Sequence, residues 1–354
     1  MGRCPTHHRL IAIKAVLSAL LIAAALAGCT AAPAKTADSA LAARLNSALA
    51  GGEVAFATQF TSPLTATSWY AVLSHAEASF APDPTAASRV AVHTRLPGDR
   101  RGASEVLSLD LAGDGTISGT VDAGVRPIWA LGRTELTATS HGTLLSSSLT
   151  AAARRGWELR LNRASVAVSR AGILTAGNHW DGGLVVEIPA DTTGFTAITG
   201  SSATDTSAIT TCSAGTPRIV INPAAFTQPA GWLQATLTHE AVHVATESPC
   251  ASGAAWVVEG AAESVAAQSD PATAKANAKL VHAYLRSHHR PTALPTSLTT
   301  QTDYALAQLA IDQVRAKLGA RAPDFIAKGI SGQLSEAAAA KATGWYLAEL
   351  KRRG

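Results

Sequence analysis

The sequence predicts an α+β protein in which helices and antiparallel strands occupy different stretches of the chain. Between residues 88 and 124, three segments alternate apolar and polar residues and are separated by Gly, Pro and Asp, which is typical of antiparallel strands. Alanine-rich, helix-forming segments precede these strands and dominate after residue 229. With 354 residues, of which 47% are apolar and 15% charged, the chain is expected to fold into two domains.

The first 28 residues have the pattern of a secretion signal. A basic start without acidic residues precedes the apolar run 15–28, which is too short to cross a bilayer as a helix but fits a signal-peptide core. The run ends in "LAGC", which resembles the bacterial lipobox. This resemblance implies cleavage before Cys29, lipidation of its thiol and anchoring to the bacterial cell membrane outside the cytoplasm. The alternative is an ordinary secretory cleavage site followed by a free cysteine.

Removal of this leader would leave a nearly neutral protein. The formal charge of +4 includes Arg3, Arg9 and Lys14, so residues 29–354 hold 26 of the 29 basic side chains against 25 acidic ones, a net charge of +1. Binding to nucleic acid through surface charge needs a clear excess of Lys and Arg. The composition therefore favours no nucleic-acid partner.

A tether and an N-terminal domain are expected to follow the leader. Residues 29–40 are small, polar and proline-containing, as in a flexible linker, and residues 41–162 form the N-terminal α+β domain. Two helices and five strand segments are expected in this domain. They cover 41–50, 65–80, 88–96, 103–113, 115–124, 125–131 and 134–140. This order of helices and then a curved sheet resembles the nuclear-transport-factor-like fold.

The second domain, 163–354, is expected to combine a mixed sheet with a mainly helical part. A connecting helix and two strands come first, and four long helices follow. They cover 163–174, 182–191, 218–226, 229–247, 255–268, 271–288 and 303–318. The intervening segment 206–217 is rich in Ser, Thr and Gly and is expected to be a loop.

Four cysteines indicate one disulfide. Cys4 leaves with the leader and Cys29 takes the lipid, so Cys212 and Cys250 remain as an even pair in an oxidising compartment. We expect them to form a disulfide, and the alternative is two buried thiols.

The segment "LTHEAVHVATESP", residues 237–249, contains candidate metal-binding and catalytic residues. Since His239 and His243 are four residues apart, one face of a helix presents both imidazoles to a single point, with Glu240 beside them. Glu259 follows His243 by 16 residues, enough for the chain to turn and return on a second helix, and Glu263 lies on the same face four residues later. A hydrolytic zinc site needs three protein ligands and one open position. Glu263 is expected to hydrogen-bond the far nitrogen of a ligand histidine, His239.

These residues resemble the gluzincin metallopeptidases, which include thermolysin and the aminopeptidase N type. The family pattern is HExxH and then a glutamate on a second helix, often within W-x-x-E-G-x-A-E. Here it stands as His239-Glu240-Ala241-Val242-His243 and Trp256-Val257-Val258-Glu259-Gly260-Ala261-Ala262-Glu263. The resemblance covers about 170–350, and its specific part is 239–263.

The resemblance implies a set of roles. One zinc ion would be held by His239, His243 and Glu259, and Glu240 would be the catalytic base. The strand 218–226 would have an edge that pairs with the substrate backbone. Tyr304, at the start of a downstream helix, is the candidate hydrogen-bond donor to the oxyanion. Weaker alternatives for this last role are Tyr284, His288 and His289.

We therefore expect a lipid-anchored, extracytoplasmic zinc peptidase that acts on peptides or proteins. Since no acidic motif for anchoring a substrate amine is visible, endopeptidase action is favoured. Two alternatives stay open. In one, zinc only stabilises a scaffold or binding lipoprotein. In the other, the N-terminal domain binds a ligand in its sheet and the peptidase domain is vestigial.

Overall fold

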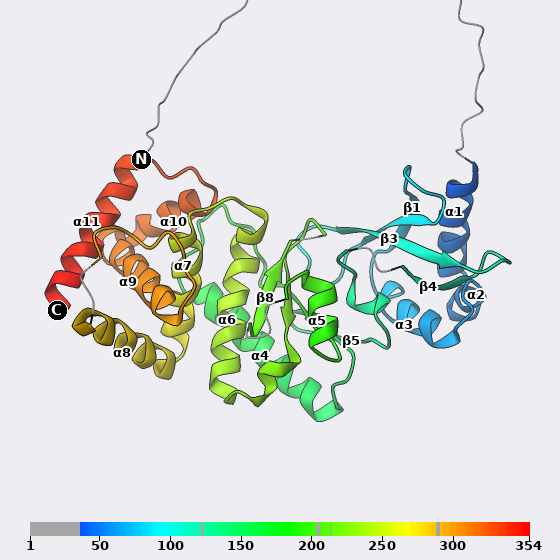
Figure 1. Ribbon diagram of the computed structural model, residues 1–354, viewed down its shortest axis with the longest axis horizontal. Helices are drawn as coiled ribbons and strands as arrows, with labels where there is room; N and C mark the ends of the chain where they lie inside the picture. The colour runs from blue at the N-terminus through cyan, green and yellow to red at the C-terminus, as the bar shows by residue number, and fades with distance from the viewer. Residues whose placement is uncertain (1–35, 122–123, 203–205, 213, 288–290) are drawn as a thin grey trace, which may run out of the picture. The chain divides into compact units, whose positions relative to one another are not determined.

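A computed structural model describes residues 36–354 except 122–123, 203–205, 213 and 288–290 (Figure 1). The predicted leader, Cys29 and the first part of the tether lie outside the described residues. Helix α1 (Thr36–Ala50) begins within the expected tether, five residues before the start expected at Leu41. Among the helices of the described residues, none is long and apolar enough to cross a membrane.

The first part of the chain has an antiparallel sheet, as expected, and three helices where the sequence predicted two. The helix predicted over 65–80 ends at Leu73, and a strand begins at Ser79. Helix α3 (Pro63–Leu73) begins where Ser62 accepts a hydrogen bond from the backbone of Thr65, with proline in the first turn. The other helices are α1 and α2 (Glu53–Ala57). The sheet runs in the order β1-β2-β3-β4. Its strands are β1 (Ser79–Pro82), β2 (Arg89–Thr94), β3 (Ala103–Leu111) and β4 (Ile117–Thr120). The resemblance to the nuclear-transport-factor-like fold stays a prediction.

The chain departs from the expected strand pattern after β4. Within 125–131, expected to be a strand, residues Ile128–Ala130 form a short 3₁₀ turn, η1, after Pro127. Trp129 is buried here, 4.7 Å from Trp69 between ring centroids. Strand β5 (Glu135–Thr139) does form, but it pairs with β6 (Gly142–Ser146) in a second sheet. Periodicity predicted this strand but not β6, which follows it after two residues and pairs with it as an antiparallel hairpin.

The boundary expected between residues 162 and 163 falls inside a helix. Helix α4 (Ala151–Arg170) begins after Thr150, whose side chain accepts a hydrogen bond from the backbone of Ala153, and it continues through both residues. The helix expected over 163–174 is therefore the second half of a longer one. Because β6 precedes α4 and β7 (Leu184–Ile188) follows it, α4 connects two parallel neighbours of one sheet.

The second sheet has five strands in the order β5-β6-β7-β9-β8. Strands β6, β7 and β9 (Arg218–Ile221) are parallel, and β5 and β8 (Ala208–Thr211) are antiparallel strands at its two ends. The expectation that 218–226 supplies the free edge is wrong, because β9 lies between β7 and β8. Strand β8 was missed since it has only four residues, within a stretch whose Ser, Thr and Gly content indicated a loop.

Both faces of this second sheet are buried, each in a different hydrophobic core. Leu184 and Val186 pack among the helices that follow the sheet. Val185, which alternates with them, packs with the apolar residues of α1–α3 and the first sheet. This two-sided burial explains why "LVVEI" is a nearly continuous apolar run rather than an alternating one.

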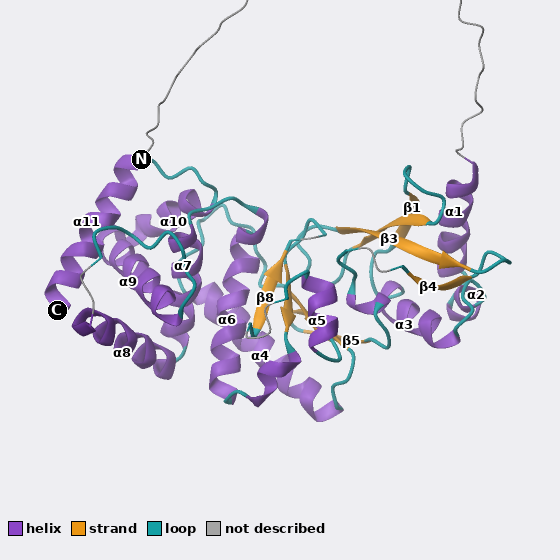
Figure 2. Cartoon of the chain, in the orientation of Figure 1, coloured by secondary structure: helices purple, strands orange, loops and turns teal. Residues whose placement is uncertain are grey.

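Helices make up the remainder of the chain (Figure 2). Helix α5 (Thr192–Thr199) lies between β7 and β8 in sequence. The four expected long helices are present with slightly shifted ends, and two more follow. They are α6 (Ala230–Thr246), α7 (Ala255–Ser269), α8 (Pro271–Ser287), α9 (Gln301–Leu318), α10 (Ala322–Ile330) and α11 (Glu336–Arg353). The α+β class predicted from the sequence is thus confirmed.

Close packing of α7 against α9 depends on a glycine. A Cβ added to Gly260 would lie 2.5 Å from the backbone oxygen of Ala307 in α9. Only a residue without a side chain fits this approach. It follows Glu259 directly, so the same helical turn sets the α7–α9 contact and the position of a predicted metal ligand.

Candidate metal centre

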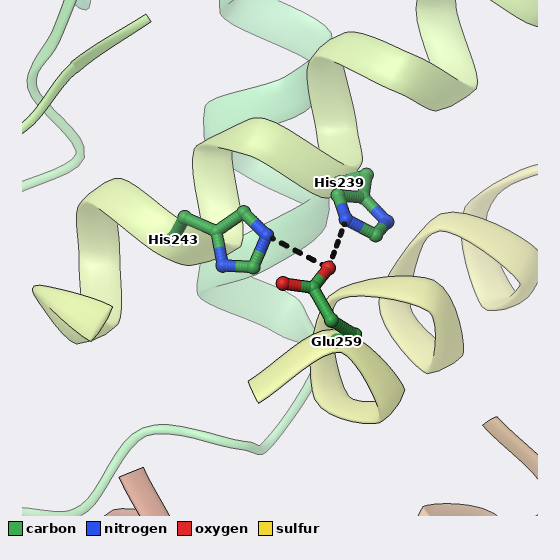
Figure 3. A group of neighbouring side chains, drawn as sticks. All are labelled: His239, His243 and Glu259. Carbon is green, nitrogen blue, oxygen red and sulfur yellow. Dashed lines mark hydrogen bonds and ion pairs between the residues drawn. The ribbon is translucent and has the colours of Figure 1, made fainter. Parts of the chain in front are cut away.

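Three predicted ligands from two helices meet at one point. Helix α6 presents His239 and His243, whose ring centroids are 4.9 Å apart, and α7 presents Glu259 (Figure 3). The Oε2 atom of Glu259 lies 3.1 Å from Nε2 of His239 and 3.4 Å from Nε2 of His243. One ligand atom from each residue lies within 4.8 Å of the others, so the group could hold a metal ion.

Hydrogen bonds within this group outweigh the effect of its burial on ionisation. Burial raises the pKa of the Glu259 carboxyl, but hydrogen bonds from His239 and His243 prevail and hold this pKa well below its ordinary value. Burial lowers the pKa of the His239 imidazole, yet hydrogen bonds with Glu259 and Glu263 hold it well above its ordinary value. The carboxylates of Glu259 and Glu263 thus favour positive charge at the His239 ring.

The far side of His239 is held by a carboxylate. Its Nδ1 lies 3.0 Å from Oε2 of Glu263, the partner that the sequence suggested. The other oxygen of Glu263 accepts a 2.6 Å hydrogen bond from Asn277 in α8, and Asn277 also donates to Gln308 in α9. A carboxylate beside Nδ1 favours the tautomer with a proton there, which leaves Nε2 free to bind a metal.

The far side of His243 has a different partner. Its Nδ1 lies 2.9 Å from Oγ of Ser248, in the 3₁₀ turn η3 (Ser248–Cys250) directly after α6. Sequence reasoning missed this serine. No residue spacing indicated it, because the contact depends on how the chain turns at the end of the helix.

Glu240 directly follows His239 in α6 and is not part of the metal-binding group. Its side chain is buried, and its Oε2 accepts a 2.6 Å hydrogen bond from the hydroxyl of Thr210 in β8. Thr210 was also missed from the sequence, since β8 was taken for a loop. The edge strand of the second sheet therefore contacts the predicted catalytic base directly.

Tyr304 lies close to the same group at the start of α9. Thr300 and Asp303 cap this helix with reciprocal hydrogen bonds. The Tyr304 ring centroid is 6.0 Å from that of His239. Burial, with the nearby charges of Glu259 and then Glu240, raises the pKa of Tyr304 to about 12.

The alternatives to Tyr304 are less well placed or lie outside the described residues. Tyr284 packs at the margin of the helical core. His288 and His289 belong to a segment that the structure does not describe. Tyr304 is thus the candidate donor that the structure brings next to a predicted metal ligand.

The predicted disulfide between Cys212 and Cys250 is confirmed and spans 38 residues of sequence. It joins the residue after β8 to the last residue of η3. The bond therefore connects the strand that contacts Glu240 with the turn that contacts His243.

Neither models of known protein families nor curated proteins gave a match to this chain. The gluzincin resemblance therefore stays a prediction from residues 239–263.

Proposed function

We propose that this chain is a zinc-dependent peptidase, lipid-anchored outside the cytoplasm, which hydrolyses peptide bonds with Glu240 as general base. The observation that carries the proposal is the placement of Glu240. Glu240 directly follows the metal-binding His239 in α6, its side chain is buried with a hydroxyl partner in Thr210, and it is not among the three metal-binding residues. A metal site that served only stability would have no use for this additional carboxylate.

Zinc is the metal that the donor set favours. Two imidazole nitrogens and one carboxylate oxygen match the ligands of hydrolytic zinc sites, which keep a fourth position open. When bound, zinc would supply a Lewis acid to the substrate carbonyl and to the attacking water. The hydrogen bonds from His239 to Glu263 and from His243 to Ser248 would orient both imidazoles toward the ion.

The protein's own groups would handle the proton and the developing charge. Glu240 takes a proton from the attacking water and passes it to the leaving amine. The Thr210 hydroxyl holds Oε2 of Glu240, so the other oxygen remains for the water. Tyr304, whose ring lies near that of His239, donates its phenol proton in a hydrogen bond to the carbonyl oxygen as that atom becomes negative.

Strand β8 offers a surface for the substrate. It is one of the two outer strands of the second sheet, and the hydroxyl of its Thr210 donates a hydrogen bond to Glu240. An extended peptide that pairs with such an edge gains backbone hydrogen bonds irrespective of its side chains. This favours endopeptidase action on an extended segment of a peptide or protein.

The test compares peptide cleavage by the wild type and by Glu240→Gln. The chain is expressed with its leader in an oxidising compartment and loaded with zinc. A mixed peptide library is then analysed by mass spectrometry, and bound zinc is measured by elemental analysis. Glu336→Gln, an exposed change at the start of α11, serves as the matched control.

We expect one zinc ion in all three proteins and cleavage by the wild type and Glu336→Gln alone. Equal cleavage by Glu240→Gln would exclude Glu240 as the base. A wild type that binds zinc but cleaves no peptide would favour the scaffold function instead.

A further inference from the structure

The turn that ends α6 has an unusual backbone. Glu247 adopts a left-handed conformation, with φ of 53°, and among the described residues it is the only one other than glycine with a positive φ. Residues with a Cβ adopt this conformation at an energetic cost, so the surrounding structure must hold it in place. The turn η3 follows immediately, and its first residue, Ser248, is 5% exposed.

The consequence of this turn is a hydrogen bond to a predicted metal ligand. Since Nε2 of His243 faces Glu259, its Nδ1 must carry the proton if Nε2 is to bind a metal. The Ser248 hydroxyl oxygen, 2.9 Å away, is placed to accept that proton's hydrogen bond. The partner of His239, by contrast, is the carboxylate of Glu263.

A hydroxyl is a weaker partner than a carboxylate, so its position matters more. A carboxylate attracts an imidazole N–H by charge as well as by direction, whereas a neutral hydroxyl gives a bond of ordinary strength. The benefit of Ser248 therefore depends on a backbone that holds its oxygen in place. The structure shows two restraints on this backbone.

The first restraint is ionic. The Glu247 carboxylate lies 3.3 Å from a guanidinium nitrogen of Arg101 and 3.7 Å from one of Arg100. Arg100 also donates to the backbone oxygen of Ala245, in the last turn of α6. The loop between β2 and β3 thus holds the residue with the strained backbone.

The second restraint is covalent. Cys250, two residues after Ser248, is bonded to Cys212, which directly follows β8. Strand β8 is itself hydrogen-bonded to β9 in the second sheet. The turn is therefore tied through Cys212 to a sheet that is buried on both faces.

We infer that Ser248 is a positioning residue for His243, and that the Cys212–Cys250 disulfide acts on the metal site by holding Ser248 in place. This inference rests on the proposed metal centre. It assigns the disulfide a role in metal affinity that is separate from its effect on the stability of the fold.

The test measures zinc affinity by competition with a chromophoric chelator, and ligand geometry by the visible absorption of the cobalt(II) form. The full chain is compared with Ser248→Ala, with the double variant Cys212→Ala/Cys250→Ala, and with all three changes combined. Ser252→Ala is the matched control, because Ser252 lies just beyond the same turn and is exposed.

Ser248→Ala should bind zinc about 10-fold more weakly, the lower end of the effect of removing such a partner, and its cobalt bands should shift. Ser252→Ala should match the wild type in both measurements. The cysteine variant should also bind zinc more weakly, but it should add little to the loss already caused by Ser248→Ala. Two changes that act through one contact are not additive.

The outcomes separate this inference from the proposed function. A wild type that binds neither zinc nor cobalt would overturn the metal centre and, with it, the inference. Metal binding by the wild type with unchanged affinity and spectrum in Ser248→Ala would overturn the inference alone. If circular dichroism shows that the cysteine variant is unfolded, Ser248→Ala and Ser252→Ala still decide the role of Ser248.

Discussion

Replacing Gly260 with alanine should disturb both the fold and the metal centre, whereas the same change at Gly344 should stabilise the protein. At Gly260 the new Cβ would lie 2.5 Å from the Ala307 backbone oxygen and 2.8 Å from Cγ1 of Ile311. At Gly344, an exposed position within α11, no atom lies within 4 Å. Since both glycines are in helices, alanine brings the same gain in helix propensity at either position. The difference between the two changes in unfolding free energy therefore measures the effect on packing.

The magnitude follows from the distances. An ordinary contact needs 3.4 Å, so α7 and α9 would have to separate by about 0.9 Å at this point. Overpacking of this kind costs about 1–3 kcal/mol. Glu259 would move with α7, and a shift of this size exceeds the ~0.2 Å tolerance of metal–ligand distances. Gly344→Ala should instead stabilise the fold by about 0.5–1 kcal/mol.

Thermal unfolding in the presence of a chelator measures the packing effect without the contribution of bound metal. The Tm should fall by about 2–6 °C for Gly260→Ala and rise by about 1–2 °C for Gly344→Ala. Zinc affinity, measured separately, should fall for Gly260→Ala alone. An unchanged or higher Tm for Gly260→Ala would refute the close helix approach on which this reasoning rests.

Three further changes test other parts of the structure. Glu263→Gln should weaken zinc binding about 10- to 100-fold in a chelator competition, because His239 loses its charged partner; equal affinity would exclude that role. Tyr304→Phe should lower kcat by about 100-fold and leave zinc content and KM unchanged, since only the developing oxyanion loses a donor; a change in KM alone would argue for substrate binding instead. Burial outweighs the attraction of Arg218 and raises the pKa of Glu187 to about 7, whereas the unfolded chain ionises near 4.5. The contribution of Glu187 to the free energy of unfolding is therefore fully present below pH 4.5. It decreases by an amount on the order of 3 kcal/mol as the pH rises to about 7. Urea unfolding at pH 5 and pH 8 should show a smaller difference for Glu187→Gln than for the wild type, and an equal difference would contradict this reasoning.

The parts of the site that could be predicted from the sequence are those set by helical periodicity. Residues four apart share one face of a helix, so the pairing of His239 with His243, and of Glu259 with Glu263, needed no knowledge of the fold. To predict that the chain returns on a second helix, it was enough that the segment between His243 and Glu259 is long enough to turn. For the same reason the long helices could be located, with their ends shifted by a few residues.

The contacts that complete the site could not be predicted, because tertiary structure sets them. Thr210 reaches Glu240 from a four-residue strand, too short for its pattern to stand out from a polar loop. Ser248 reaches His243 because Glu247 takes a left-handed conformation, which a glutamate seldom adopts. Asn277 reaches Glu263 from a different helix. In each case the residue type is common and only its position gives it a role.

The second sheet shows why the N-terminal part of the chain matters for the site. Val185 and Val220 on one face of that sheet pack with residues of α1–α3 and the first sheet, so without this part their side chains would lie in water. The backbone of Ser104 in β3 also donates a 2.8 Å hydrogen bond to Ala214, two residues after Cys212. The first sheet therefore supports the segment that follows β8, and that segment carries the disulfide. A ligand-binding role for the N-terminal part is not needed to explain its presence, because it covers the sheet from which Thr210 contacts Glu240.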